Sequence, residues 1–355
     1  MGSAALHQLS KRGLKVLGLE AFEPGHQLGS SHGESRVIRL AYHEHPSYVP
    51  LLLRAYELWA DLEAESGETL LTITGGLMIG SPDSELVSGA LSSARLHGLM
   101  HAVLAPEEVR YRYPAFNPAE DEIAVWEPRS GYLKPERCIE TFVRLARQGG
   151  AEVRYSEPVR GRSANEVRTD TDVHRAARVV FTCGARMSKV LGDAIPPVVA
   201  ERSPLFWLEP SMPFGNVPIY LWETANRQVF YGFPHVEWPG AKVAVHHTGE
   251  FVDPDAVDRR VTAEDERRLR AAIGSRIASL RNGPVLDSRV CLYENSPDGH
   301  FVIDRLSDEV VYAAGFSGHG FKFASVVGEI LADLVTRGSA TPDADFLRSV
   351  RLLSS

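Results

Sequence analysis

A segment near the end of the chain, residues 314–323, places three glycines, a histidine and a lysine between a predicted buried strand and a predicted helix. Glycines let backbone N–H groups approach a ligand closely, and the helix that follows aims its amino-terminal end at the same point. An ordinary strand-to-helix turn accounts for one glycine, and for two only with difficulty. We therefore interpret residues 314–323 as a ligand-binding loop, to which His319 and Lys322 add polar side chains.

Two arginines, Arg36 and Arg39, lie three residues apart in a segment that otherwise holds Val, Ile, Leu and Ala. If this segment is helical, both guanidinium groups lie on one face, and two cations on an apolar element need anionic partners. The alternative interpretation is a solvated pair of surface arginines.

Lys242 and His246 lie four residues apart in a predicted strand, residues 241–247, so the period of two places both on one face. His247 is expected on the opposite face, where it cannot share a site with them. Taken alone, His246 is more often a hydrogen-bonded sheet histidine, and Cys291 is more often a buried inert thiol.

The elements that must position these residues follow from hydrophobic periodicity and turn signals. Their order begins as βαβ, continues as mixed β structure and ends as βα. This order predicts an α/β (α+β) fold in which a dinucleotide-type domain is interrupted by a second, sheet-rich domain. The predicted helices are residues 2–13, 48–66, 135–149, 263–280 and 324–336, and the predicted strands are residues 14–20, 71–79, 179–182, two or three between 219 and 247, and 310–314.

The first helix and the strand after it match part of a dinucleotide-binding unit. In that unit a helix lies between a first strand with a glycine-rich turn and a second strand whose terminal acid bonds a ribose hydroxyl. Residues 2–13 supply the helix and Glu20 supplies the acid, but no strand precedes the helix. We therefore expect the unit without its first strand.

Length and composition exclude several classes of protein. The 355 residues are enough for two domains, and the 44% hydrophobic and 24% charged residues are typical of globular proteins. The net charge of −8 gives no overall attraction to nucleic acid or anionic lipid. No apolar run approaches the roughly 20 residues that span a bilayer, and three widely spaced cysteines do not resemble a disulfide framework. We expect a cytoplasmic protein without a membrane or nucleic-acid partner, and we predict no metal site.

Three motifs taken together resemble one known family. They are Gly-Ser-Ser-His-Gly-Glu-Ser-Arg-Val-Ile-Arg at residues 29–39, Cys-Leu-Tyr at residues 291–293 and the glycine-rich loop at residues 314–323. In register from Met1 to about residue 340, the chain resembles the monomeric sarcosine oxidase family of flavoprotein amine oxidases, which includes N-methyltryptophan and pipecolate oxidases. The resemblance implies an FAD-binding domain of residues 1–70, 136–202 and 290–355, interrupted by a mixed-sheet substrate domain of residues 71–135 and 203–289.

In the family, a strand and a Gly-x-Gly turn precede the residues that match Met1 and Gly2. The resemblance therefore implies that roughly a dozen residues of the dinucleotide fingerprint are absent and that Gly2 is its last glycine. A start placed too late in the sequence is the favoured explanation, because the later positions of the family pattern are intact.

The resemblance assigns cofactor-binding roles in each motif. Cys291 matches the cysteine that usually carries the flavin as a thioether, and a thiol at a flavin methyl edge can form such a link. Glu20 would bind the adenosine ribose, and Arg36 would lie against the flavin. The full set implied for FAD is Gly2, Glu20, Ser31, His32, Arg36, Thr182, Gly184, Cys291, Gly315, Ser317, Gly320, Phe321 and Lys322.

By the same resemblance, Arg39 and Lys322 bind the substrate carboxylate, the first as a bidentate fork and the second as a point charge. Lys242 matches the lysine that promotes the reaction with O2, where a fixed cation stabilises superoxide. His246 and Tyr231 complete the catalytic set. The pocket wall is expected from Trp222, Tyr293, Gly318 and His319, and Trp222, which replaces a smaller side chain of sarcosine-specific members, favours cyclic or bulky substrates over sarcosine.

The activity implied is that of an FAD-dependent oxidase of N-alkyl or cyclic secondary amino acids. A neutral amine would give a hydride equivalent to the flavin, the imine would hydrolyse, and O2 would be reduced to hydrogen peroxide. We expect an electropositive site with no carboxylate near it, in a protein that acts as a monomer. Two alternatives stay open, a flavin dehydrogenase with another acceptor and a non-catalytic remnant that binds an amino acid or a protein.

Overall fold

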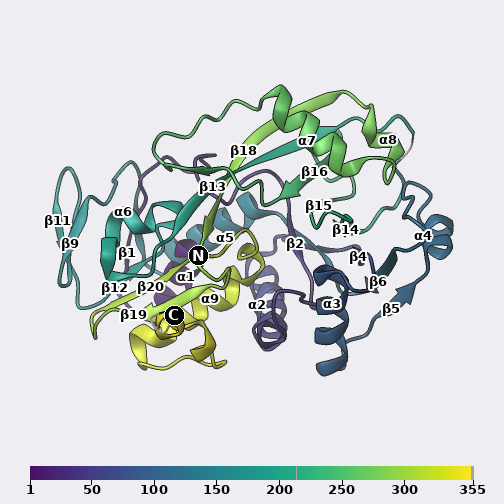
Figure 1. Ribbon diagram of the computed structural model, residues 1–355. Helices are drawn as coiled ribbons and strands as arrows, with labels where there is room; N and C mark the ends of the chain where they lie inside the picture. Colours follow the sequence, from purple (N-terminus) through teal and green to yellow (C-terminus); the bar gives the residue numbers. More distant parts are fainter. Residues whose placement is uncertain (213, 353–355) are drawn as a thin grey trace.

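The computed structural model describes residues 1–212 and 214–352. It confirms the mixed α/β fold and shows two regions with different kinds of sheet (Figure 1). Among the described helices, none combines the length and the apolar composition that a membrane crossing needs.

The first region contains two small sheets, each with one parallel pair of strands. Within the described residues no strand pairs with both sheets, so they stay separate. The separation lies where a dinucleotide-binding fold has its first strand. One sheet consists of β1 (Leu17–Leu19) and β8 (Glu152–Arg154), and the other of β12 (Val179–Phe181), β20 (Val310–Ala314) and β19 (Val302–Arg305).

Four helices of this region bury their apolar faces in one core with β20. The first and last of them approach each other closely, because a Cβ atom at Gly328 would lie 2.7 Å from the carbonyl carbon of Ala4. This contact fixes the start of the first helix relative to the glycine-rich loop. The four helices are α1 (Gly2–Lys11), α2 (Val49–Ser66), α5 (Pro135–Gln148) and α9 (Ala324–Thr336).

The second region is a nine-stranded mixed sheet in the order β17-β13-β16-β15-β14-β4-β6-β5, with β18 also paired to β13. The long antiparallel pairing of β13 with β18 carries Cys291 opposite Ser203. The strands are β4 (Gly76–Gly80), β5 (Ala102–Leu104), β6 (Ile123–Glu127), β13 (Val199–Leu208), β14 (Ile219–Glu223), β15 (Val229–Gly232), β16 (Ala241–His246), β17 (Phe251–Val252) and β18 (Val285–Asn295).

Alternation of side chains gives this sheet two different faces. One face carries Trp222 and packs against α7 (Ala263–Ile273) in an apolar core. The other face carries Leu221 and packs against α3 (Glu85–Leu96). Shorter helices at the edges are α4 (Pro106–Arg112), α6 (Met187–Leu191) and α8 (Ala278–Arg281).

Two antiparallel sheets of three strands complete the fold. One consists of β2 (Arg36–Ile38), β7 (Gly131–Leu133) and β3 (Leu71–Ile73), and the other of β9 (Gly161–Ser163), β10 (Glu166–Arg168) and β11 (Val173–Arg175). The helix considered for residues 36–39 is therefore wrong. The backbone there is extended, because it pairs with β7.

Three further elements differ from their predicted ranges. The strand expected over residues 14–20 is confined to β1, and the strand expected over 71–79 is two strands, β3 and β4. The helix expected over 263–280 ends at Ile273 and resumes as α8, because Gly274 adopts a φ of +51° that stops the first helix.

Candidate active site

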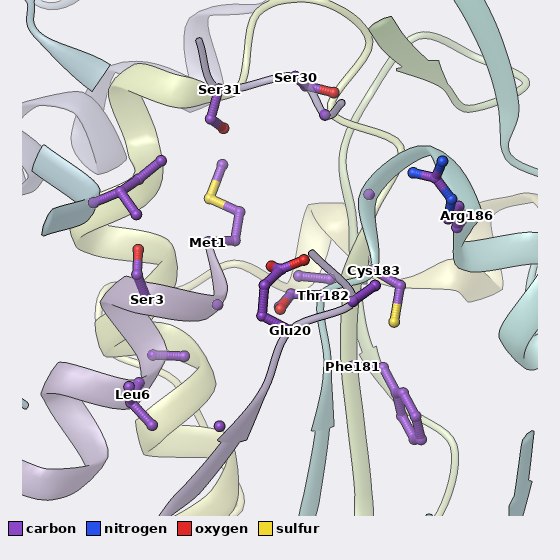
Figure 2. A pocket seen from close by; sticks show the side chains of 18 of the residues that line it. Met1, Ser3, Leu6, Glu20, Ser30, Ser31, Phe181, Thr182, Cys183 and Arg186 are labelled. Carbon is purple, nitrogen blue, oxygen red and sulfur yellow. The ribbon is translucent and has the colours of Figure 1, made fainter. Parts of the chain in front are cut away.

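A cavity of about 2140 Å³ is lined by residues from both regions of the fold. Its lining comes from the start of α1, the ends of β1 and β12, the loop before β2, and strands β15, β16 and β18. Figure 2 shows one end of it, where Met1 points into the space near Ser31 and Glu20. Leu19 and Phe181 also line the cavity, so part of its volume lies between the two small sheets.

The first end of the cavity has the features of a dinucleotide site. α1 begins at Gly2, and its free backbone N–H groups favour an anion there. Gly2 approaches Thr182 so closely that a Cβ atom would lie 2.7 Å from the threonine Oγ1. Glu20 follows β1 and lines the same end, where its carboxylate accepts a hydrogen bond of 3.1 Å from the Phe22 backbone.

Acidic side chains from other elements hold the loop before β2. Glu136, on α5, accepts hydrogen bonds from the backbone N–H groups of Gly33 (2.6 Å) and Glu34 (3.2 Å). Glu127, on β6, accepts from the N–H groups of Leu40 (2.8 Å) and Ala41 (3.0 Å) just after β2. The segment that carries Arg36 and Arg39 is therefore fixed at both of its ends.

Arg36 lies beside Cys291 in the cavity wall. Its Nη2 donates to the Cys291 Sγ at 3.3 Å and to the Ser30 carbonyl at 2.8 Å. Cys291 is 2% exposed, and its sulfur is the part of β18 that faces the loop before β2. The arginine and the thiol therefore lie side by side in the cavity wall.

Arg39 is buried and already carries an anionic partner. Its Nη2 donates to both carboxylate oxygens of Glu44, at 2.9 and 2.8 Å, and lies 2.9 Å from the Nδ1 of His43. Burial alone would raise the pKa of Glu44, but Arg39 and His43 hold that pKa well below its usual range. The expectation of a site without a carboxylate is therefore wrong, because Glu44 lines the cavity beside the arginine.

Lys322 provides a second cation near Arg39. Its Nζ donates to the His319 carbonyl at 2.6 Å and lies 5.3 Å from the centre of the Tyr42 ring. Burial and the charge of Arg39 lower the pKa of Lys322 to about 7. Burial lowers the pKa of His319 to about 3, and its Nδ1 is hydrogen-bonded to the Tyr42 hydroxyl.

Two tyrosines and a histidine form an uncharged wall. The hydroxyls of Tyr231 and Tyr293 are hydrogen-bonded, and the Tyr293 hydroxyl lies 3.2 Å from the Nδ1 of His246. Burial raises the pKa of both tyrosines and lowers the pKa of His246 well below its usual value. Gly318, with a φ of +76°, sits against Tyr293, where a Cβ atom would lie 2.5 Å from the ring.

Lys242 lies on the same strand as His246 but points behind the cavity wall. Its Nζ donates to the carbonyls of Gly33 (2.5 Å) and Ser35 (2.8 Å) and lies 3.3 Å from the Ser35 hydroxyl. Three acceptors suit the three protons of an ammonium group. Burial and the charge of Arg36 nevertheless lower the pKa of Lys242 well below its usual value.

Most of the residues predicted for the site meet in this one cavity. Lys242, His32, Trp222, Gly315 and Ser317 are not part of its lining. The predicted residues that line it are Gly2, Glu20, Ser31, Arg36, Arg39, Thr182, Gly184, Tyr231, His246, Cys291, Tyr293, Gly318, His319, Gly320, Phe321 and Lys322.

The placement of Trp222 is a correction. Its indole is fully buried on the far face of the mixed sheet, where Nε1 donates to Glu122 at 3.1 Å and the ring stacks on Phe230. The neighbouring Leu221 lines the cavity instead, because side chains alternate along β14. Trp222 therefore gives no argument for bulky substrates.

His32, Gly315 and Ser317 support the cavity from behind. His32 is 1% exposed, and burial lowers its pKa to about 3. The Ser317 hydroxyl donates to the Gly315 carbonyl at 3.0 Å and accepts from the Ser296 backbone at 3.2 Å. These hydrogen bonds hold the shape of the glycine-rich loop, and the two residues that make them do not line the cavity.

His247 stays outside the lining of the cavity, but its ring does not lie on the opposite face of the strand. β16 ends at His246, and His247 takes a left-handed φ of 58°, which turns its ring to within 4.2 Å of the His246 ring and 5.3 Å of Tyr293. The Nδ1 of His247 lies 2.9 Å from a carboxylate oxygen of Glu201. The period-two argument fails there because the strand has ended.

The lining residues that the sequence argument missed include His43, Glu44 and Glu294. Glu44 stands five residues after Arg39, and an acid so close to a buried arginine is a signal that could have been used. Nothing in the sequence marks Glu294 as buried, since it follows the Cys-Leu-Tyr motif in a strand of mixed burial.

This geometry, a large cavity with a helix amino-terminus and two buried cations in its lining, is typical of proteins that bind a dinucleotide and an anionic small molecule. Residues 1–334 match the family model described as FAD dependent oxidoreductase. The chain is 42% identical to the monomeric sarcosine oxidase of Streptomyces avermitilis, over 96% of this chain and 92% of that protein. It therefore belongs to the FAD-dependent oxidoreductase family, and the resemblance drawn from its motifs is confirmed.

Other similar proteins extend the comparison. The chain is 32% identical to the N-methyl-L-tryptophan oxidase of Yersinia pestis, over 94% of this chain and 91% of that protein. The solved structure of L-proline dehydrogenase from P. horikoshii gives a TM-score of 0.85 at 23% identity, over 99% of this chain and 94% of that one. NikD, an amino acid oxidase of nikkomycin biosynthesis, gives 0.84 at 23% identity, over 98% and 94%. At these identities the two structures show the shared fold.

The residues of the cavity fit the FAD that the family uses. Gly2 packs closely against Thr182, α1 presents its amino-terminal end to the cavity, and the Glu20 carboxylate, a hydrogen-bond acceptor, lines the same end. The Cys291 sulfur faces the other end.

Proposed function

We propose that this chain is an FAD-dependent oxidase of N-alkyl or cyclic secondary amino acids, which oxidises the C–N bond to an imine and reduces O2 to hydrogen peroxide. When bound, FAD supplies the two-electron chemistry. The observation that carries the proposal is that Arg39 and Lys322, two buried cations, line the same cavity as Cys291 and the Glu20 end.

The two cations serve as the anchor for the substrate carboxylate. Arg39 is bound to Glu44 in the structure, so an incoming carboxylate replaces the Glu44 carboxylate on the guanidinium group. Exchange of one carboxylate for another keeps the buried arginine paired, while the displaced Glu44 carboxylate keeps His43, 3.2 Å away, as a neighbour. Lys322, with a pKa near 7, gains its charge most readily when a carboxylate arrives.

The uncharged wall holds the amine. Tyr231, Tyr293 and His246 are all neutral at pH 7, since burial shifts their pKa values away from the charged forms. A site with buried cations and neutral neighbours disfavours an ammonium group and favours the free amine. The lone pair that oxidation needs is therefore available on the bound substrate.

The cofactor would be held along the cavity from Glu20 to Cys291, and Cys291 would carry it as a thioether. Arg36 supports this assignment, because its guanidinium group contacts both the sulfur and the Ser30 carbonyl. In this proposal residues 1–70, 136–202 and 290–355 serve the cofactor, and residues 71–135 and 203–289 serve the substrate. β13 and β18 cross these limits, so the two parts share the long strand pair.

Lys242 would promote the reaction with O2. Its Nζ shares the Ser35 carbonyl with the Arg36 guanidinium group, each at 2.8 Å, so it lies beside the arginine proposed to contact the flavin. A monomer that acts in the cytoplasm is part of the same proposal.

A panel of substrates tests the function. Sarcosine, proline, pipecolate and N-methyltryptophan are offered to the purified protein, and peroxide release is measured beside an alkylamine that lacks a carboxylate. We expect at least one amino acid to turn over with peroxide release and the alkylamine to be at least tenfold worse, since a charge-assisted hydrogen bond contributes about 1.5–3 kcal/mol. If the substrate reduces the flavin under anaerobic conditions but no peroxide forms in air, the protein is a dehydrogenase instead.

A further inference from the structure

Glu294 is a buried carboxyl group in the wall of the cofactor cavity. It lies on β18, three residues after Cys291, and is 6% exposed. The backbone of Phe316 hydrogen-bonds one side of the carboxyl group. Its Oε2 atom has no hydrogen-bond partner among the described residues, although the residue lines the cavity. A buried polar atom left open toward a cavity indicates a missing ligand atom.

No side-chain cation among the described residues offsets the charge of the Glu294 carboxylate. Within the described residues no lysine, arginine or histidine forms an ion pair with it, and its charged neighbour is the α-amino group of Met1, whose own pKa is lowered by burial. The Cys183 thiol lies nearby, and burial raises its pKa to about 12, so it is neutral. Glu20 adds a second carboxylate near the Met1 amino group.

A carboxylate in such a place is unfavourable, because burial penalises the charged form. Burial accordingly raises the pKa of Glu294 to about 8. At neutral pH the side chain is then a carboxylic acid, which offers one O–H donor. Gly184 leaves the space beside this group open, since even a Cβ atom there would lie 3.8 Å from the Oε2.

The position of Glu294 indicates which part of FAD it would contact. The proposed function places the adenosine end of FAD at Glu20 and the flavin end at Cys291. Met1, Thr182 and Cys183 surround the end near Glu20 (Figure 2). Glu294 lies close to Met1 and Cys183, and its own strand, β18, carries Cys291 three residues earlier. The diphosphate and ribityl segment occupies the middle of FAD. A diphosphate accepts hydrogen bonds and repels a carboxylate.

We propose that Glu294 faces FAD as a neutral carboxylic acid and donates its proton in a hydrogen bond to the diphosphate and ribityl segment, so that ionisation of Glu294 weakens FAD binding. This inference rests on the proposed function, because it takes the occupant of the cavity to be FAD. A protonated Glu294 gives the site a hydrogen-bond donor, whereas an ionised Glu294 would repel the diphosphate.

The sign of the pH dependence follows from linkage. The bound state retains a proton that free Glu294 loses as the pH rises through about 8. Affinity for FAD is therefore constant below that pH and falls above it, by at most about tenfold per pH unit for a single proton.

The test measures FAD binding rather than turnover. The full-length Cys291→Ser variant is freed of flavin and titrated with FAD between pH 6.5 and 9.5, with quenching of flavin fluorescence as the signal. We expect a constant Kd up to about pH 8 and a rise of about tenfold by pH 9.5. In Cys291→Ser/Glu294→Gln, which keeps a donor but cannot ionise, the Kd should stay constant over the whole range.

Glu201 supplies the matched control. It is also a buried glutamate, on the neighbouring strand β13, but it is held by Asn295 and His247 outside the lining of the cavity. Glu201→Gln should keep the parent's rise of Kd with pH. A parent whose Kd does not change with pH overturns the inference without any use of the Gln variant, and so does a Glu294→Gln variant with the parent's pH dependence. Failure of the parent to bind FAD at any pH would instead contradict the proposed function.

Discussion

Arg39 donates from a single nitrogen, Nη2, to both carboxylate oxygens of Glu44, so the proposed substrate anchor is closed by an acid of its own chain. Both side chains are largely buried, with 2% and 14% of their surfaces exposed. Binding of a substrate is therefore an exchange of carboxylates on one guanidinium group. The strength of the internal pair sets how tightly any external carboxylate binds.

Glu44→Gln should strengthen the binding of simple carboxylates. The amide cannot compete for Arg39 as an anion, and the difference between a charged and a neutral acceptor is worth about 1–2 kcal/mol, or roughly tenfold in the inhibition constant of acetate. The inhibition constants of the variant and the parent decide the matter. Arg39→Ala, as the opposite control, should weaken acetate by about 10–100-fold. Weaker acetate binding in Glu44→Gln would show that Glu44 supports the anchor instead of competing for it.

Lys322 should make carboxylate binding depend on pH near neutrality. Its pKa is lowered to about 7, so the charge is present below pH 7 and lost above it. Glu44 stays ionised and His319, with a pKa near 3, stays neutral over this range. The inhibition constant of acetate should therefore rise by about tenfold or more between pH 6 and pH 9. Lys322→Gln should bind acetate weakly and equally at both pH values, and a parent without pH dependence would contradict the assignment.

Lys242→Gln should slow the reaction with O2 while leaving reduction by substrate nearly unchanged. Glutamine still donates to the Gly33 and Ser35 carbonyls but carries no charge, so the variant separates electrostatics from support of the loop. Loss of one charge-stabilising group reduces a rate by about 10²–10³ in comparable sites. Stopped-flow measurement of each half-reaction reports the two effects separately. Equal losses in both would show that the lysine acts by holding the loop.

Cys291→Ser should release its flavin on denaturation, whereas the parent should stay yellow after precipitation with acid. The serine hydroxyl fits the space of the thiol beside Arg36 but is a poor partner for a thioether-type link. Absorbance of the supernatant gives the answer. Cys183→Ser, whose side chain also lines the cavity, should behave like the parent. Flavin in the supernatant of the parent would contradict the proposed covalent link, but it would not contradict FAD binding.

The sequence located most of the long helices well, but it did not predict the conformation or the facing of the short strands. Apolar periodicity located α2 and α5, because each buries one face over several turns. The three residues of β2 are too few for any period to appear, and their extended form comes from pairing with β7. The prediction that Trp222 faces the cavity came from the resemblance alone. In the structure Trp222 packs against Phe230 and Glu122 on the other face of the sheet.

Site residues could be predicted where they belong to a sequence motif. They could not be predicted where only the tertiary structure brings them to the cavity. The motifs located Arg36, Cys291 and Lys322, which line one cavity although they lie far apart in the chain. Glu44 and Glu294 are ordinary acids in the sequence. Their importance depends on burial and on neighbours from other elements, which no local pattern encodes.

The support of the β2 segment by Glu136 and Glu127 has a consequence for how this scaffold can be altered. The segment between the contacts of those two acids carries both Arg36 and Arg39. The proposed cofactor contact and the proposed substrate anchor therefore lie on one segment that is held at both ends. An insertion or deletion there would misplace both arginines at once. The substrate range is therefore more readily changed at Leu221, which lines the cavity from β14 and belongs neither to this segment nor to the wall that holds the amine.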